Sequence, residues 1–98
     1  MQEVKTVEEF ENLVSSDDVT FVYFTAVWCG PCQKVGPVFR GLQGVRLVKV
    51  DADAAEPVFD AQNIQAIPTV QVWRAKTLLK TINGCSGDAV AALHKQYS

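Results

Sequence analysis

The sequence has few of the residues from which metal centres and secreted disulfide scaffolds are built. Its 98 residues include three cysteines and one histidine. So small and odd a number of cysteines does not fit a scaffold held by several disulfides. The opening stretch, MQEVKTVEEFENL, carries acidic side chains where a secretory signal has a basic segment and then an apolar one. We therefore expect an intracellular protein that is cytoplasmic.

Excess charge, long apolar runs and nucleotide motifs are also lacking. The formal net charge is −2 at pH 7, and the lysines and arginines are scattered, so we expect neither nucleic acid nor an anionic membrane as a partner. No apolar stretch approaches the ~20 residues that span a bilayer. Neither GxGxxG nor a Walker loop occurs, so we expect no cofactor. With 48% apolar and 20% charged residues, the chain reads as one globular domain over residues 1–98.

Strand and helix patterns alternate along the chain. The predicted strands are residues 3–5, 19–25, 45–51, 68–73 and 77–82. The predicted helices are residues 7–14, about 32–42, 57–62 and 88–97. Gly36-Pro37 interrupts the second of these and should kink it. Thr6 and Glu9 can form a capping box before the first helix, and Ser86 can cap the last. The order β-α-β-α-β-α-β-β-α predicts an α/β domain, a mixed central β-sheet with helices on both faces.

The stretch AVWCGPCQK places Cys29 and Cys32 between the strand at 19–25 and the helix that follows. The free N–H groups and positive end of a helix favour a thiolate over a thiol, and the thiolate is the nucleophile in disulfide exchange. We expect Cys29 to attack a disulfide. Cys32, one turn into the helix and more buried, is expected to resolve the mixed disulfide.

The neighbours of the pair fit the same chemistry. Gly30 lets the backbone turn and permits a partner to approach closely. Pro31 can start a helix without leaving an N–H unpaired, and it stiffens the pair. Trp28 offers a flat apolar wall beside the sulfurs.

Two other uses of the pair are open at this point. As a structural staple it is weak, because a disulfide that closes a four-residue ring constrains the unfolded chain by only about 2 kcal/mol. As half of a zinc site it needs two more ligands, which Cys85 and His94 could supply by count. No second closely spaced pair is present, so a redox role for Cys29 and Cys32 is favoured and we expect no metal.

His94 and Cys85 have simpler expected places. His94 should lie on a solvated face of the last helix, and Cys85 should be a small core or surface residue. Cys85 follows Gly84 in a loop near the sheet edge that carries the cysteine pair, so a regulatory or intermolecular thiol is a further option.

WCGPC at a strand–helix junction, AIPTV further along and the glycine of ING together resemble the thioredoxin family. The resemblance covers nearly the whole chain and keeps the order of its elements. It implies a thioredoxin fold and a protein-disulfide oxidoreductase, an electron carrier that contributes to cell redox homeostasis. It also implies a cis peptide bond before Pro68 and a mostly apolar surface that binds clients. The residues of that surface would be Trp28, Gly30, Pro31, Ile67, Pro68 and Gly84.

The resemblance implies partners as well. Thioredoxin reductase, an NADPH-dependent flavoprotein, would restore the dithiol. The clients would be disulfide-containing proteins such as peroxiredoxins or ribonucleotide reductase. Two alternatives stay open. One is a specialised relative with a trypanothione- or glutathione-linked reductase, against which WCGPC rather than WCPPC or CPYC argues. The other is a thioredoxin-fold adaptor subunit whose redox activity is incidental.

One position departs from the family pattern in a way that concerns proton transfer. Thioredoxins usually carry a buried aspartate five positions before the tryptophan of WCGPC, and counting back from Trp28 gives Tyr23. That carboxylate is thought to take the proton of the resolving cysteine, whereas a phenol with an ordinary pKa of about 10 is a poor base at pH 7. We expect Tyr23 to fill the buried face with its hydroxyl bonded to a partner, and Cys32 to lose its proton to water or client. The lysine usual after WCGPC is Gln33.

Overall fold

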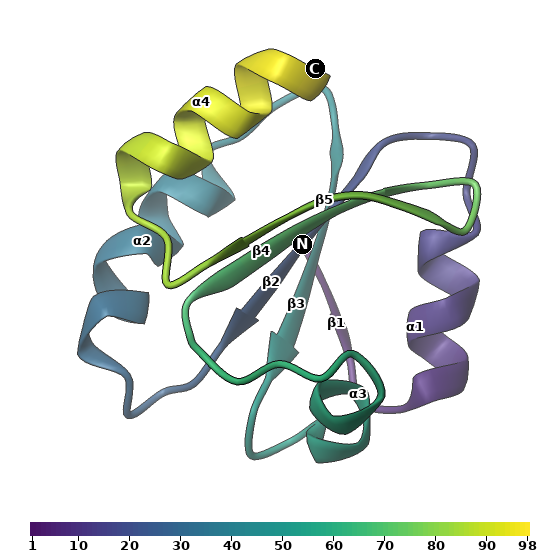
Figure 1. The fold of residues 1–98 in the computed structure, drawn as a ribbon, viewed down its shortest axis with the longest axis horizontal. Coiled ribbons are helices and arrows are strands. Elements are labelled where there is room, and N and C mark those ends of the chain that lie inside the picture. Colours follow the sequence, from purple (N-terminus) through teal and green to yellow (C-terminus); the bar gives the residue numbers. More distant parts are fainter.

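Residues 1–98 are all described by the structure, a computed structural model, and form a five-stranded sheet with two helices on each face (Figure 1). The strands are β1 (Gln2–Val4), β2 (Thr20–Thr25), β3 (Arg46–Asp51), β4 (Thr69–Arg74) and β5 (Thr77–Asn83). The helices are α1 (Val7–Val14), α2 (Gly30–Arg40), α3 (Glu56–Ala61) and α4 (Gly87–Tyr97). None of these helices combines the length and the apolarity that crossing a bilayer requires. The predicted element order and α/β architecture are confirmed.

The sheet has the strand order β1-β3-β2-β4-β5. Both β1 and β2 run parallel to β3, because crossover helices connect these strands. In contrast, β4 runs antiparallel to β2 and to β5. Ala75 and Lys76 turn the chain between the last two strands with φ angles of 50° and 66°, as a tight hairpin requires. The strand that precedes the cysteine pair, β2, therefore lies at the centre of the sheet.

Side chains of β2 alternate between two hydrophobic cores. Val22 and Phe24 face the core shared with α1 and α3, whereas Phe21 and Tyr23 face the core shared with α2 and α4. Every residue of β2 is buried. Coverage on both faces explains why the sequence of this strand is apolar without alternation.

Local signals set several helix ends. Thr6 and Glu9 form both halves of the capping box of α1. The backbone N–H groups of Lys5 and Thr6 both donate to the Glu9 carboxylate. These bonds lower the pKa of Glu9, and the bond from Lys5 has the larger effect. Ser86 caps α4 through its side chain. Asn63 follows α3 with a φ of 52°, the left-handed conformation that commonly ends a helix.

The helix after the cysteine pair differs from its predicted bounds. It begins at Gly30 because Cys29 is its N-cap, and Pro31 occupies the first turn, where no partner for an N–H is needed. It ends at Arg40 and remains helical through Pro37, so Gly36-Pro37 do not break the helix, and the kink expected there stays a prediction. Tertiary packing of one face of α2 on the sheet and α4 outweighs the single lost hydrogen bond. The other predicted boundaries differ from the observed ones by at most one residue.

His94 is less exposed than its predicted place on a solvated face of the last helix implied. Its ring is half-buried and packs edge-on against Phe21, with ring centroids 6.0 Å apart. Its Nε2 lies 2.6 Å from the carbonyl oxygen of Gln43. His94 follows the buried Leu93 on α4 and so lies at the border of the apolar stripe of that helix. At such a border, contacts with other elements determine how far a side chain is buried. His94 thus joins α4 to the loop after α2.

Replacing Phe24 by alanine should remove much of the stability of the fold. Phe24 is fully buried and packs against Phe10 and Phe59, with ring centroids 6.3 and 5.4 Å away. The cavity left by Phe24→Ala should lower the free energy of unfolding by about 3–5 kcal/mol. Leu79→Ala, at an exposed position on β5, is the control and should change it by less than about 0.5 kcal/mol. Chemical denaturation measures both, and equal losses would contradict the described packing.

Candidate active site

Cys29 and Cys32 lie where β2 ends and α2 begins. After Thr25, the last residue of β2, a short loop is closed by the Cys29 N–H, which donates to the Ala26 carbonyl oxygen at 3.2 Å. Cys29 is the N-cap of α2, and its Sγ accepts the Cys32 N–H at 3.3 Å. A sulfur in this position meets the unpaired N–H groups and positive end of the helix, both of which favour the thiolate.

The two cysteines form a disulfide, with Cα atoms 5.2 Å apart. Cys29 is 7% exposed and Cys32 is 1% exposed, which confirms the predicted difference in burial. An incoming sulfur therefore reaches Cys29 and not Cys32. A small ring with one accessible sulfur suits a pair that opens and closes better than a staple between distant segments.

Trp28 stands on the surface beside the pair. It is 69% exposed, and its Nε1 donates to the Oδ2 of Asp53 at 3.0 Å. Asp51 supports the same loop, because its Oδ1 accepts the N–H groups of Asp53 and Ala54. Sequence reasoning missed Asp53. It could have been found from its position just after β3, because the carboxyl ends of the parallel strands β2 and β3 lie at the same edge of the sheet, where Trp28 also lies.

The loop before β4 forms the other wall of the site. The Ile67–Pro68 peptide bond is cis, as the resemblance implied. Ile67 packs against the small cluster that contains Cys29 and Cys32. The Pro68 carbonyl oxygen accepts the N–H of Cys85 at 3.0 Å and lies 3.5 Å from its Sγ. Cys85 is thus close to the site, as predicted, but behind its surface.

Cys85 and Gly84 have different accessibility although they are neighbours. The Cys85 side chain is buried, and burial raises the pKa of its thiol. Gly84 is exposed, with a φ of +59°, a conformation that glycine adopts without a steric penalty. The Cys85 thiol is therefore part of the core, whereas Gly84 is part of the surface.

An apolar groove of about 210 Å³ extends from Trp28 to Ile67. Its other lining residues are Ala52, Phe59, Ile64, Gln65 and Ala66. Gly30 and Pro31 are exposed beside the sulfurs, whereas Ile67 is half-buried and Pro68 is buried. The residues predicted to bind clients thus surround Cys29, and the groove extends their surface on the Trp28 side.

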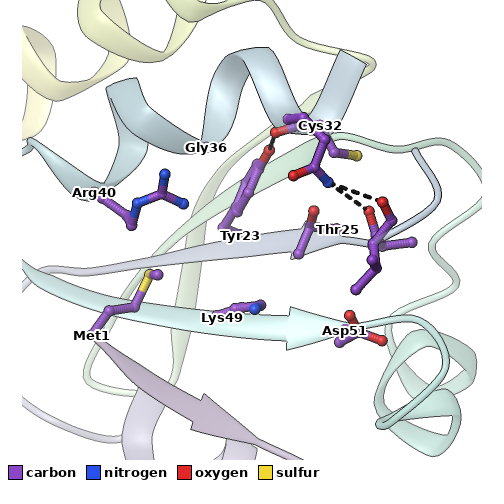
Figure 2. A pocket seen from close by; sticks show the side chains of 11 residues that line it. Met1, Tyr23, Thr25, Cys32, Gly36, Arg40, Lys49 and Asp51 are labelled. Carbon is purple, nitrogen blue, oxygen red and sulfur yellow. Dashed lines mark hydrogen bonds between the residues drawn. The ribbon is translucent and has the colours of Figure 1, made fainter. Parts of the chain in front are cut away.

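Tyr23 lies on the inner side of Cys32, between that residue and the sheet and away from the apolar groove (Figure 2). Its hydroxyl donates to the Cys32 carbonyl oxygen at 2.6 Å, and its ring stacks on Phe39 with centroids 4.9 Å apart. Burial raises the pKa of Tyr23, against the smaller opposing effects of the Thr25 hydrogen bond and the Arg40 charge. The phenol is therefore neutral at pH 7. The prediction that its hydroxyl bonds to a partner is confirmed.

Gln33 ties the active-site loop to α2. Its Nε2 donates to the carbonyl oxygens of Ala26 and Val27, each 3.2 Å away, as the dashed lines in Figure 2 show. A lysine could donate to the same oxygens but would add a positive charge near the sulfurs. The neutral amide holds the loop without that charge. The sequence pointed to Gln33 only as a departure from the family pattern.

The four residues that could have held zinc by count do not come together. No group of three or more His, Cys, Asp or Glu side chains is arranged to hold a metal ion. Cys85 lies against the Pro68 carbonyl, and His94 contacts the carbonyl of Gln43. Cys85 and His94 therefore lie against other groups and do not join the cysteine pair.

Comparison with known proteins identifies relatives along the whole chain. The thioredoxin family model matches residues 2–96. Thioredoxin of Coprinus comatus is 29% identical over 99 residues, which cover 95% of this chain and 93% of that protein. The structure of Plasmodium falciparum thioredoxin has a TM-score of 0.91 at 27% identity, with 100% of both chains covered. A second similar structure has a TM-score of 0.88 at 26% identity, with 98% of this chain and 94% of the other covered. It comes from work on the thiol resolving mechanism in a yeast mitochondrial 1-Cys peroxiredoxin via glutathione/thioredoxin systems.

These relatives agree with the chemistry of the site. A cysteine pair in which one sulfur is accessible at a helix N-terminus and the other is buried one turn later is suited to exchange disulfides. The fold that holds the pair is shared over the full length of the chain. We conclude that the chain belongs to the thioredoxin family and that its activity is that of a protein thiol–disulfide oxidoreductase.

Proposed function

We propose that the chain is a general protein-disulfide reductase in which Cys29 attacks the client and Cys32 resolves. One observation carries this assignment: Cys29 is the N-cap of α2 and its Sγ accepts the Cys32 N–H. The helix end favours the Cys29 thiolate, which is also the sulfur that a client can reach. Nothing in the fold or the relatives favours an adaptor with incidental redox activity.

Reduction of a client takes two exchanges. The Cys29 thiolate attacks one sulfur of the client disulfide, forms a mixed disulfide and releases the other client sulfur as a thiolate. The Cys32 thiolate then attacks the Sγ of Cys29, which releases the second client sulfur and forms the Cys29–Cys32 disulfide. Two electrons pass to the client, and the two protons lost by the cysteine pair balance the two taken up by the client thiolates.

An extended client segment is proposed to pair with the loop that contains Ile67. The backbone N–H and carbonyl of Ile67 make no backbone hydrogen bond within the chain, so both are available to a peptide. Pairing of this kind supplies affinity through the main chain, and neighbouring pockets select side chains. The groove between Trp28 and Ile67 is lined mostly by apolar residues and would take an apolar client side chain.

The partners follow from family membership and are part of the proposal. An NADPH-dependent flavoprotein, thioredoxin reductase, would return the pair to the dithiol. Clients would be disulfide-containing proteins such as peroxiredoxins or ribonucleotide reductase, and the yeast peroxiredoxin work named above offers a precedent in a relative. In this role the chain would act in the cytoplasm as an electron carrier that contributes to cell redox homeostasis.

Alkylation of the reduced protein should label Cys29 first. The helix N-terminus favours the Cys29 thiolate, whereas Cys32 is less exposed and burial raises the pKa of Cys85. Limiting iodoacetamide at pH 7, followed by peptide mapping, measures the order of labelling. Guanidinium-unfolded protein is the control, in which the three thiols should react at similar rates. Labelling of Cys32 or Cys85 before Cys29 in the folded protein would overturn the assignment of roles.

Single cysteine variants should separate the two exchanges. Cys29→Ser should lower the rate of insulin reduction by dithiothreitol to the rate without the protein, because the attacking sulfur is gone. Cys32→Ser should also stop turnover, but it should accumulate a mixed disulfide that mass spectrometry detects. Cys85→Ala keeps both sulfurs of the pair and is the matched control, with turnover close to that of the wild type. Full turnover by Cys29→Ser would show that the pair is incidental to function.

The choice of reductant should identify the physiological system. We expect catalytic NADPH oxidation when the oxidised protein is mixed with a thioredoxin reductase and a client disulfide. Glutathione with its reductase, and trypanothione with its own, should give rates at least about tenfold lower, a difference of about 1.4 kcal/mol in transition-state free energy. Omission of the chain is the control. A faster reaction with either alternative would indicate the specialised relative instead.

A further inference from the structure

A polar pocket lies between the inner side of Cys32 and the sheet (Figure 2). Its volume is about 90 Å³, well above the ~10–15 Å³ that one water molecule needs. The residues that line it include Tyr23, Thr25, Cys32, Arg40, Lys49 and Asp51. Water can therefore approach the buried cysteine from the side opposite the client.

Strand register brings the polar groups of the pocket together. Tyr23 lies opposite Lys49, and Thr25 lies opposite Asp51, in the parallel pair of β2 and β3. Residues two apart on a strand face the same side, so all four side chains point toward α2. The sequence shows none of these pairings, because the two strands are separated by the whole of α2.

A second cation reaches the pocket from α2. Arg40 folds back over Gly36, and its guanidinium points along the helix toward Tyr23 (Figure 2). A Cβ at Gly36 would lie 3.1 Å from the Nη1 of Arg40, so the absence of a side chain there keeps this path open.

Positive charge exceeds negative charge around Cys32. Arg40 and Lys49 are two cations, whereas Asp51 is the only carboxylate of the pocket, and one of its oxygens already accepts two backbone N–H groups. The Tyr23 hydroxyl donates a hydrogen bond to the Cys32 carbonyl oxygen, and burial keeps this phenol neutral, so it adds no charge to the pocket. The other titratable residues nearby are Cys29, Met1 at the N-terminus, which lines the pocket, and the buried Cys85, which packs in the same core as Tyr23.

We propose that Arg40 and Lys49 favour the thiolate of Cys32 through the polar pocket, so that water, and no protein side chain, accepts the proton of the resolving cysteine. This inference rests on the proposed two-step function. Both residues act through Cys32 and are positioning residues rather than catalytic ones. In the resolving step the Cys32 S–H bond breaks, its proton passes to water, and the sulfur electron pair forms the bond to the Sγ of Cys29. The client thiolate is the leaving group and takes up a proton from solvent.

The test follows the two exchanges with an aromatic disulfide, dithiobis(nitrobenzoate), which releases one coloured thiolate in each. Arg40→Gln and Lys49→Gln should each raise the pH midpoint of the second release by about half a unit, as expected for one partly screened charge. Below the midpoint this slows resolution about threefold for each variant and about tenfold for the double variant. The first release, from attack by Cys29, should change much less.

Two further double variants and a salt dependence distinguish the charge effect from structural damage. Arg40→Lys combined with Lys49→Arg keeps both charges and should keep the wild-type midpoint. Lys80→Gln combined with Lys95→Gln makes the same change in net charge away from the pocket and should also leave it unchanged. In addition, high salt should reduce the difference between wild type and the Arg40→Gln, Lys49→Gln variant.

Asp51→Asn tests whether the Asp51 carboxylate, rather than water, accepts the proton of Cys32. Its amide oxygen can still accept the same backbone N–H groups, and loss of the negative charge should lower the midpoint and leave resolution intact. If resolution instead collapses, Asp51 is the base and the proposal is wrong. An unchanged midpoint in the Arg40→Gln, Lys49→Gln variant also overturns the proposal, while normal insulin reduction in the same sample would leave the proposed function standing.

Discussion

The junction between β2 and α2 is the constraint on which the site depends. Burial of β2 at the centre of the sheet fixes where its last residue lies, and Cys29 caps the helix that starts five residues later. Gln33 binds the intervening loop back to the first turns of α2. The accessible sulfur is thus held at a helix N-terminus by two rigid elements, and its reactivity follows from that position.

The two sides of the cysteine pair have contrasting chemistry. Toward the client lie an apolar groove and the unpaired backbone groups of Ile67. Toward the sheet lies a small polar pocket with two cations and one carboxylate. The buried Cys32 separates them. Recognition and proton release can therefore be handled on opposite faces of the same four-residue ring.

Tyr23 shows how a family position can be kept structurally while its chemistry changes. Its ring joins the core by stacking on Phe39, and its hydroxyl bonds to the carbonyl of Cys32. Burial raises its pKa, so it has no capacity to act as a base at neutral pH. Any help for the resolving cysteine must come from the neighbouring strand or from α2, where Lys49 and Arg40 lie.

The amino-acid sequence was enough to predict the element order, the apolar central strand, the caps at Thr6 and Ser86 and the cysteine pair at a helix start. These depend on residues within a few positions of one another, where propensity, capping and periodicity act directly. It also indicated that Tyr23 would need a partner, because a buried phenol rarely leaves its hydroxyl unpaired.

In contrast, the groups that meet across the sheet and between loops became known from the three-dimensional packing. The Trp28–Asp53 hydrogen bond, the contact of His94 with Gln43 and the approach of Lys49 to Tyr23 all join different elements. The reach of Arg40 into the pocket depends in addition on the missing side chain at Gly36. Such contacts follow from strand order, register and helix packing, which bring distant residues together by burying apolar area and leave no periodic trace in the polar residues themselves.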